Sequence, residues 1–584
     1  MGRDVNVKIH RWLAASATAL AAVTASAQPT GNFSTQRLST IDKQLSSNAF
    51  QGRAPGSAIE PTVIRYIADQ LKAAGVQPGG DIVNGQRTWF QKVPLLQSEI
   101  VGTPEISLNE NGTVVPLRQG PDIAVLAPLN GANRVDIENA PLVFVGYGVN
   151  APERGWNDFK GQDMHGKVLV ALVNDPDFEA APGEPVAGKF GGKAMTYYGR
   201  WTYKFEEAAR QGAAGIILIH ETAPASYGWE VVQNSNTIGQ FDIVRDNPAA
   251  AHSPMESWIQ RPFAVQLFQR SGLDLEQAKL AARSPNFQPM PLKATLTARY
   301  AATPKVITSH NVVGLLPGKT HPDETIIYSA HWDHLGVGKP DAKGDRIYNG
   351  AVDNGTGVAQ VIEQARAFAH GPRPDRSIVF LLVTAEEKGL LGSEYYATHP
   401  LYDAAKTVAD LNVDAWLPNG RQKDFTVRGT AKLDLIDMVV AEGKRQGRYY
   451  VPDPHPETGG FYRSDHFPFA KVGVPAISFS PGLDLVNGGT ARGEQLATEY
   501  NRLHYHQPSD EWSPSWDWSG VAQNAELLHQ VGLDLANSRA WPNWSPDSEF
   551  RAARDASAAS RGAAAPPPPP AAAPAETPQK GERG

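Results

Sequence analysis

The stretch from residue 325 to residue 414 decides the fold, because its short apolar runs are each followed by residues of a restricted polar kind. Three runs lead directly into such residues: TIIYSA into HWDH (325–334), SIVFLLVT into AEE (377–387) and TVADLNV into Asp414 (407–414). Between the first two, GAVDNG (350–355) precedes an apolar pattern with helical spacing. Strands that alternate with helices predict an α/β fold, with a mostly parallel mixed sheet flanked by helices.

Histidines and carboxylates collect at the predicted carboxyl ends of these strands, where chemistry gathers in open α/β sheets. A further cluster, HYHQPSD (504–510), lies near the end of the folded region. A buried carboxylate without a partner is costly, and a divalent cation would balance all of these groups at once. The chain has no cysteine, so a metal ion has to be held by His, Asp and Glu, the ligands that suit zinc without thiolate.

Each segment alone also has an ordinary structural explanation. A single histidine or aspartate can be a satisfied core residue, and Glu386-Glu387 can be a charge pair at a helix start. Together, in a consistent strand and helix order, the segments favour a metal site. Five ligands with one bridging carboxylate would hold two metal ions, and one of the adjacent glutamates would remain free to take a proton from water.

The motifs resemble a known family over residues 305–515. The matching strings are SAHWDHLG, NGAVDNGTG, TAEEKGLLGS, LNVDAW, YRSDHFPF and HYHQPSDEW. In this order and spacing they are similar to the catalytic domain of the co-catalytic zinc aminopeptidases, whose relatives include glutamate carboxypeptidase II, the transferrin receptor and the glutaminyl cyclases. The resemblance implies a zinc exopeptidase fold.

The resemblance also implies a role for individual residues and two Zn²⁺ per chain. One zinc would be bound by His331 and Asp414, the other by Glu387 and His506, with Asp353 bridging the two. The remaining implied roles are the general base for Glu386, orientation of His331 for the Asp333 carboxylate, oxyanion stabilisation for Tyr505 and substrate contact for Arg463.

The middle region, residues 125–300, resembles an inserted, β-rich protease-associated domain, through GYGVNAP, GKVLVALVNDP and EEAARQGAAGIILIH. The sequence therefore predicts this organisation: a signal peptide (1–27), the amino-terminal part of the catalytic domain (28–124), the insert (125–300), the zinc peptidase domain (301–545) and a disordered Ala/Pro-rich tail (552–584). A helix is expected over residues 60–74, where apolar residues recur at helical spacing and Gly75 can end it.

The amino-terminus is typical of an export signal. Arg3, Lys8 and Arg11 precede a short apolar run (12–23), and Ala-Ser-Ala (25–27) is a small-x-small cleavage site. Nothing later in the sequence resembles a membrane span. We therefore expect a periplasmic or secreted protein whose mature chain has no membrane span.

Composition excludes several other classes of function. The formal net charge is −7 and basic clusters are missing, so a nucleic-acid partner is not expected. The sequence contains neither a G-x-S-x-G elbow nor H-E-x-x-H, which argues against serine hydrolases and thermolysin-type peptidases. GLLPGKT (314–320) has the wrong glycine spacing for a phosphate loop and is interpreted as a turn.

The predicted function is that of an exported zinc-dependent metallo-exopeptidase, most simply an aminopeptidase acting on peptides. A carboxypeptidase or dipeptidase of the same fold is the alternative. A binding protein that keeps a vestigial site is a third, less favoured hypothesis, since every ligand position is filled. The sequence does not encode the preferred side chain or the oligomeric state.

Overall fold

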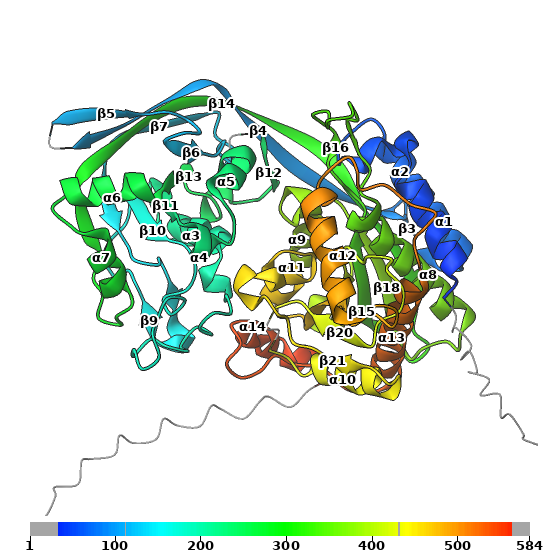
Figure 1. The fold of residues 1–584 in the computed structure, drawn as a ribbon. Coiled ribbons are helices and arrows are strands. Elements are labelled where there is room, and N and C mark those ends of the chain that lie inside the picture. Colours follow the sequence, from blue (N-terminus) through cyan, green and yellow to red (C-terminus); the bar gives the residue numbers. More distant parts are fainter. Residues whose placement is uncertain (1–32, 111, 237, 430–431, 563–584) are drawn as a thin grey trace, which may run out of the picture.

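Two bodies joined by two very long strands make up the computed structural model, which describes residues 33–110, 112–236, 238–429 and 432–562. The long strands are β4 (Phe90–Glu110) and β14 (Met290–Leu316) (Figure 1). We call residues 33–95 and 307–562 the main body and residues 100–302 the insert body, since each has its own hydrophobic core. One sheet continues through both, in the order β21-β20-β22-β19-β15-β18-β14-β7-β10-β11-β13-β6.

The centre of the main-body sheet is parallel, as predicted. Its strands are β15 (His321–His331), β18 (Arg376–Val383), β19 (Thr407–Val413), β22 (Ala476–Pro481), β20 (Asp424–Val427) and β21 (Tyr449–Tyr450). β15 pairs in parallel with β18 and β19, and β19 with β22. β14 and β20 join antiparallel at either side, which makes the sheet mixed. The carboxyl ends of the parallel strands therefore share one edge.

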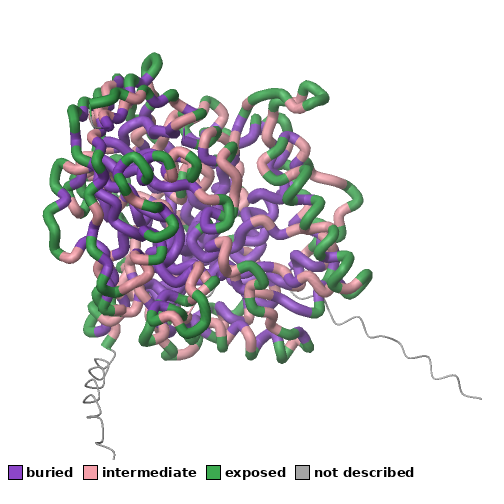
Figure 2. Tube along the Cα trace, turned by 60° about the vertical axis from the view of Figure 1, so that its left-hand side comes forward, coloured by how far each residue is buried: buried purple, intermediate pink, exposed green. Residues whose placement is uncertain are grey.

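Helices cover both faces of this sheet because side chains of successive strand residues point to opposite sides. Ile326 and Tyr328 face one core and Ile327 the other. The first face carries α1 (Thr35–Leu45), α2 (Glu60–Ala74), α8 (Thr356–His370) and α13 (Ser519–Asn537). The second carries α9 (Leu391–Thr398) and α11 (His466–Lys471). Buried residues fill the interior of the molecule (Figure 2).

The helix expected over residues 60–74 is confirmed as α2. Its residues Val63, Ile67 and Leu71 are fully buried, and all lie on one face. Gly75 has φ 100° and its N–H caps the last turn, a left-handed conformation that glycine adopts without a steric penalty.

The insert body is an α/β unit that contains many strands. Its strands are β5 (Thr113–Leu117), β6 (Ile123–Val125), β7 (Arg134–Phe144), β10 (Val168–Leu172), β11 (Gly215–His220), β12 (Gln240–Ile243) and β13 (Met255–Gln260). Its helices include α3 (Trp201–Arg210), α5 (Trp229–Asn236), α6 (Arg261–Arg270) and α7 (Leu275–Ala282). Strands β7, β10, β11 and β13 pair in parallel.

The predicted boundary between residues 124 and 125 is wrong. Ile106, Leu108 and Leu117 already pack in the core of the insert body. β4 crosses from one body to the other without a break, because it pairs with β14 along almost its whole length. No turn marks the transition, so the sequence offered no signal for it.

The boundary of the predicted tail is also wrong for residues 552–562. This segment contains most of α14 (Arg551–Ala556) and a 3₁₀ turn, Ala558–Arg561. Arg554 is buried and donates hydrogen bonds to the carbonyls of Thr407 (2.9 Å) and Val408 (3.4 Å) at the start of β19. Residues 563–584, like the predicted signal peptide, lie outside the described residues. Among the helices that are described, none has the length and apolar character needed to span a membrane.

Candidate metal centre

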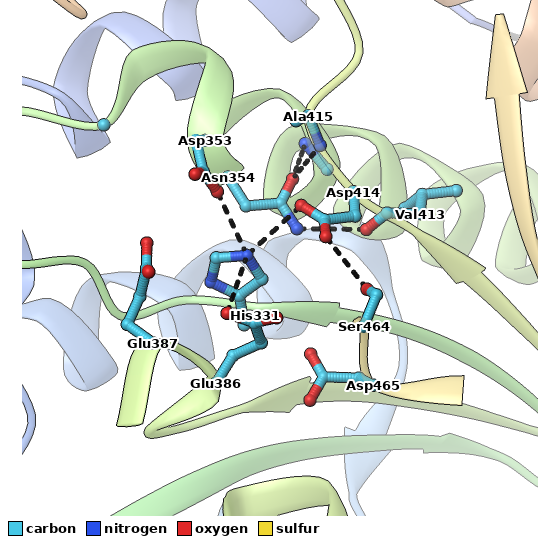
Figure 3. Close-up of polar contacts among 12 residues, drawn as sticks. His331, Asp353, Asn354, Glu386, Glu387, Val413, Asp414, Ala415, Ser464 and Asp465 are labelled. Carbon is cyan, nitrogen blue, oxygen red and sulfur yellow. Dashed lines mark hydrogen bonds and ion pairs between the residues drawn. The ribbon is translucent and has the colours of Figure 1, made fainter. Parts of the chain in front are cut away.

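Three strands deliver the predicted ligands to the shared carboxyl edge of the sheet. His331 is the last residue of β15, and Asp414 directly follows β19. Glu386 and Glu387 begin a 3₁₀ turn (Glu386–Lys388) just after β18. Figure 3 shows Asp414 and Glu386 directed at His331, with Glu387 beside them. The parallel order of the strands is what brings residues more than 80 positions apart into one site.

Asp353 lies between two histidines and presents a different oxygen to each. It belongs to the turn Ala351–Gly355 that leads into α8. Its Oδ1 is 3.2 Å from Nε2 of His331, and its Oδ2 is 3.3 Å from Nε2 of His506. His331 Nε2 is also 3.3 Å from Asp414 Oδ1, and His506 Nε2 is 3.1 Å from Glu387 Oε2. The five predicted ligands therefore form two groups that share Asp353.

These separations fit zinc. Tetrahedral zinc with bonds of about 2.0–2.1 Å to nitrogen and oxygen keeps its ligand atoms roughly 3.3 Å apart. His331, Asp353 and Asp414 form one group of atoms that could hold a metal ion, and His334, Asp353 and Glu387 form another. Within the described residues, no lysine or arginine makes an ion pair with these carboxylates. The donor set and its uncompensated negative charge both suit divalent cations.

The histidines and carboxylates of the centre strongly perturb one another. Burial would lower the pKa of His331, but the charge of Glu386 and contacts with the two aspartates raise it well above its ordinary value. Burial would raise the pKa of Asp353, but hydrogen bonds from His331 and His506 hold it well below its ordinary value. The imidazoles thus provide the only positive charge that the described residues bring into contact with Asp353.

Hydrogen bonds from behind fix the ligand-bearing loops. Ser464 Oγ donates to Asp414 Oδ2 (2.9 Å), and Asn354 Nδ2 donates to the carbonyl of Val413 (3.0 Å) (Figure 3). Such supporting contacts set ligand orientation and metal affinity.

Asp510 supports the bridging residue through the backbone. Its Oδ1 accepts the N–H of Val352 at 3.0 Å, and its Oδ2 accepts the N–H of Asp353 at 3.1 Å. Tyr500 also donates to Oδ2, at 3.1 Å. Asp510 lies only four residues after His506, so one short segment supplies a ligand and clamps the bridge.

A buried arginine ties the amino-terminal segment to the same loops. Arg53 donates to the carbonyls of Trp332 (2.8 Å), Asn349 (2.6 Å) and Gly350 (2.8 Å). These carbonyls flank His331 and Asp353. Residues around Arg53 therefore pack with the candidate site, as the sequence predicted for the start of the mature chain.

Several residues beside the ligands have left-handed backbone conformations without being glycine. Ala385 (φ 54°) precedes Glu386, Ala415 (φ 52°) follows Asp414, and His506 itself has φ 57°. Each such residue costs about 1–3 kcal/mol and persists only where the surroundings enforce it. Three such residues lie at one edge of the sheet, next to the proposed ligands. This agrees with a site whose geometry is maintained at a cost in local stability.

Glu386 is positioned beside the ligands but makes no side-chain hydrogen bond within the described residues. Its Oε2 is 4.0 Å from His331 Nε2. Burial raises its pKa well above the ordinary value, with His331 opposing and Glu387 adding to the rise.

Asp333 acts differently from the expectation. Its carboxylate Oδ1 is 3.8 Å from His331 Nδ1, whereas its backbone carbonyl oxygen is 3.1 Å away. The carboxylate instead accepts the N–H of Glu386 at 3.1 Å. The tight turn after β15 points the carbonyl at the imidazole, so the carbonyl orients His331 and the side chain anchors Glu386.

A pocket of about 440 Å³ opens beside the centre and brings the two remaining predicted residues to it. Tyr505 and Arg463 both line this pocket, together with Asp353, Glu386 and Asp414. The ring of Tyr505 stacks on His506 with a centroid distance of 3.9 Å.

Sequence reasoning did not assign three residues that the structure places at the centre. His334 is fully buried and its Nδ1 contacts Glu387, while Nε2 has no hydrogen-bond partner within the described residues. Asp510 and Arg53 act through backbone groups. His334 and Asp510 stand in the HWDH and HYHQPSD strings, so a closer look at those strings would have marked them as candidates.

Residues 311–532 match the family model described as "Peptidase family M28". This region of the chain is therefore similar to that family. A "Probable zinc metalloprotease" of Pyrenophora teres f. teres (strain 0-1) is 36% identical over 115 residues, covering 20% of this chain and 24% of that protein. "Aminopeptidase YwaD" of Bacillus subtilis (strain 168) is 29% identical over 206 residues, covering 35% and 40%. The family model is thus described as a peptidase family, and these two relatives are named as a zinc metalloprotease and an aminopeptidase.

The chain spans less than half the length of either of these curated relatives. Among solved structures, an aminopeptidase from Aneurinibacillus sp. strain AM-1 aligns over 87% of this chain and 95% of its own, at 19% identity and a TM-score of 0.45.

Proposed function

We propose that this chain is a two-zinc exopeptidase, most simply an aminopeptidase that removes amino-terminal residues from peptides. The observation that carries the proposal is Asp353, whose two oxygens face His331 and His506 at 3.2 and 3.3 Å. A carboxylate in this position has the geometry of a bridge between two metal ions. His331 and Asp414 would hold one ion, and Glu387 and His506 the other.

Zinc ions bound there would supply Lewis acidity that polarises the scissile carbonyl and makes water a stronger nucleophile. The residues of the chain would do the rest. Glu386 would accept the proton of the attacking water and return it to the leaving amine, because its carboxylate faces the pocket without a committed partner. The N–H of Glu386 is held by Asp333, which fixes where that carboxylate starts from.

Tyr505 would stabilise the oxyanion that develops on the carbonyl, since it lines the same pocket as Glu386. Arg463, on another wall, would contact the substrate. Of the nine predicted site residues, these two depend most on how a peptide lies in the pocket.

A carboxypeptidase or dipeptidase activity uses the same centre and is the second candidate. Peptides blocked at one end separate the two. An aminopeptidase cleaves peptides with an amidated carboxy-terminus and spares those with an acetylated amino-terminus. Turnover of the acetylated peptides would refute the aminopeptidase assignment.

We also propose that the protein is exported to the periplasm or secreted. The support is the charged, apolar and small-residue order of residues 1–27. Fractionation of cells that express the full chain, with amino-terminal sequencing of the product, tests it. A product retained in the cytoplasm with residue 1 intact would contradict export.

The decisive experiment measures metal and activity on one sample. Protein purified without chelator is analysed for elemental content and assayed with aminoacyl p-nitroanilides before and after chelation. The expected result is about two zinc ions per chain, with activity lost on chelation and restored by zinc. Metal-free protein that stays inactive after zinc or cobalt is added would favour the vestigial binding protein.

A further inference from the structure

The pocket beside the metal centre has walls of opposite charge. Asp353, Glu386 and Asp414 form its acidic side. Its other charged lining residues are Arg428 and Arg463. The basic side comes from two different loops of the main body, one after β20 and one before α11.

Neither of these arginines makes an ion pair within the described part of the chain. Arg428 Nε donates to Ser480 Oγ at 3.1 Å, and the rest of its guanidinium has no partner there. Arg463 is exposed and its side chain makes no hydrogen bond to a described residue. Asp453, which lies beside Gly460 on this wall, accepts the N–H groups of Gly429 (2.6 Å) and His455 (2.9 Å) and forms no ion pair with either arginine.

A third arginine reaches this wall from the insert body. Arg200 packs against Gly459, where an added Cβ would lie 3.5 Å from Arg200 Cδ. Gly460, the next residue, lines the pocket. The Nε of Arg200 is buried and has no hydrogen-bond partner among the described residues. Burial, and then the nearby charge of Arg463, lower the pKa of Arg200 to about 10, although Tyr227 opposes this.

Some of the other buried or half-buried arginines are paired with acids. Arg245 contacts Asp242 at 2.6 Å, and Arg376 contacts Glu324 at 2.7 Å. Like charges gathered without an acid are unfavourable, and a buried guanidinium nitrogen without a partner adds to the cost. A negatively charged ligand in the pocket would offset the positive charge gathered on this wall.

We propose that Arg428 and Arg463 form an anion subsite that binds a carboxylate of the peptide substrate, with Arg200 adding positive charge from the insert body. A guanidinium matches the two oxygens of a carboxylate in a planar, bidentate contact. The subsite deepens the proposed peptidase function and rests on it. An acidic side chain and the free carboxy-terminus of a short peptide both supply this group.

The first test compares paired substrates that differ by one negative charge. Glutamyl against glutaminyl p-nitroanilide probes the side chain. Leucyl-glycine against its amide probes the carboxy-terminus. The ratio of kcat/KM within each pair is measured for the zinc-loaded wild type, Arg428→Met and Arg463→Met. Arg65→Met serves as the control, because Arg65 is exposed on α2 and does not line the pocket.

For one of the pairs, both pocket variants should lose preference for the charged member by about tenfold, since each variant removes a charged hydrogen-bond donor. The pair that responds identifies the source of the carboxylate. Arg65→Met should keep the wild-type ratios. If both ratios stay unchanged in both pocket variants, the subsite does not exist.

A second test does not depend on turnover. Titration calorimetry measures the Kd of glutarate and of its neutral diamide for the same zinc-loaded proteins. Glutarate binding should weaken about tenfold in Arg428→Met and Arg463→Met and stay the same in Arg65→Met. An unchanged glutarate Kd overturns the proposal. A wild type that discriminates glutarate but cleaves no peptide would refute the peptidase function and leave the subsite standing.

Discussion

Among the described residues, two clusters place a histidine between carboxylates, and one of them has the features of a metal site. In the main body, His331 Nε2 lies 3.2 Å from Asp353 and 3.3 Å from Asp414. In the insert body, His252 lies 3.0 Å from both Asp242 and Glu256. The distances are similar. The difference is the surrounding charge.

The insert cluster contains its own cation. Arg245 contacts Asp242 at 2.6 Å and reaches Glu394 of α9 at 3.0 Å, so this cluster is a closed ionic network that also joins the two bodies. At the metal centre no arginine or lysine of the described residues pairs with the carboxylates. A histidine among acids therefore indicates a metal only when the protein supplies no compensating cation. The basic side of the pocket, which we call the arginine wall (Arg200, Arg428 and Arg463), is the same case with opposite charge. No described acid forms an ion pair with these arginines, and the proposed ligand is an anion.

Replacement of Asp353 should have the largest effect. Asp353→Asn removes the charge that both candidate metal positions share, so we expect zinc content to fall below one per chain. Activity should fall at least about 10⁴-fold, because the metal contribution is lost together with proton transfer. Elemental analysis and peptide turnover measure both effects. Asp242→Asn, the matched change in the insert cluster, should leave zinc content at the wild-type level. Equal loss of zinc in the two variants would show that the two clusters do not differ in metal binding.

Glu386→Gln should separate metal binding from chemistry. The amide cannot accept the proton of the attacking water, so kcat should fall about 10²–10⁴-fold. Zinc content should stay at the wild-type value, since Glu386 belongs to neither pair of proposed ligands. A fully active variant would show that another group is the base.

Asp510→Asn should weaken the centre without touching a ligand. An amide offers one acceptor oxygen in place of two, so either Val352 or Asp353 loses its backbone partner. Loss of a supporting contact of this kind costs about 10–100-fold in metal affinity. Chelator competition measures the zinc Kd, with the exposed neighbour change Glu511→Gln as control. An unchanged zinc Kd in Asp510→Asn would show that Asp510 does not contribute to metal binding.

The insert cluster predicts the smallest effect, on stability and its pH dependence. Burial lowers the pKa of His252, but Glu256 and Asp242 outweigh it and raise the pKa from 6.5 to about 10. A raised folded-state pKa adds stability that is fully present below pH 6.5 and is lost as the pH rises through about 10. His252→Gln should therefore lower the Tm by a few degrees below pH 6.5 and by less near pH 10. A pH-independent difference in calorimetric Tm would contradict the ionic role.

The strands and ligands were predictable because they depend on local pattern. An apolar run that ends in His or Asp marks both a strand and the edge where it stops, and the order of the runs predicts a parallel sheet. The clamp by Asp510 was not predictable in this way, since its partners are backbone N–H groups about 158 positions away. The grouping of Arg200, Arg428 and Arg463 was not predictable from the sequence either. These residues come together only because the insert body packs against the main body.

The predicted domain boundaries were wrong where the sequence pattern continues although the segment changes its packing partner. β4 keeps one extended register while its packing changes from one core to the other, so no sequence signal accompanies the switch near residue 100. The segment 552–562 has the alanine content of the tail, yet Arg554 anchors it to β19. In both cases the boundary depends on a contact with residues that are distant in the sequence.

The continuous β4–β14 pair has a mechanical consequence. The two strands stay hydrogen-bonded from Phe90 opposite Val312 to Glu110 opposite Ala294, with one register shift between Arg299 and Ala301. A two-stranded ribbon of this kind resists bending in the plane of the sheet, because such bending would break the hydrogen bonds between its strands. It twists more easily. A change in the angle between the two bodies would therefore have to bend or twist this paired ribbon, and Arg200 would move with the insert body relative to the pocket wall of the main body.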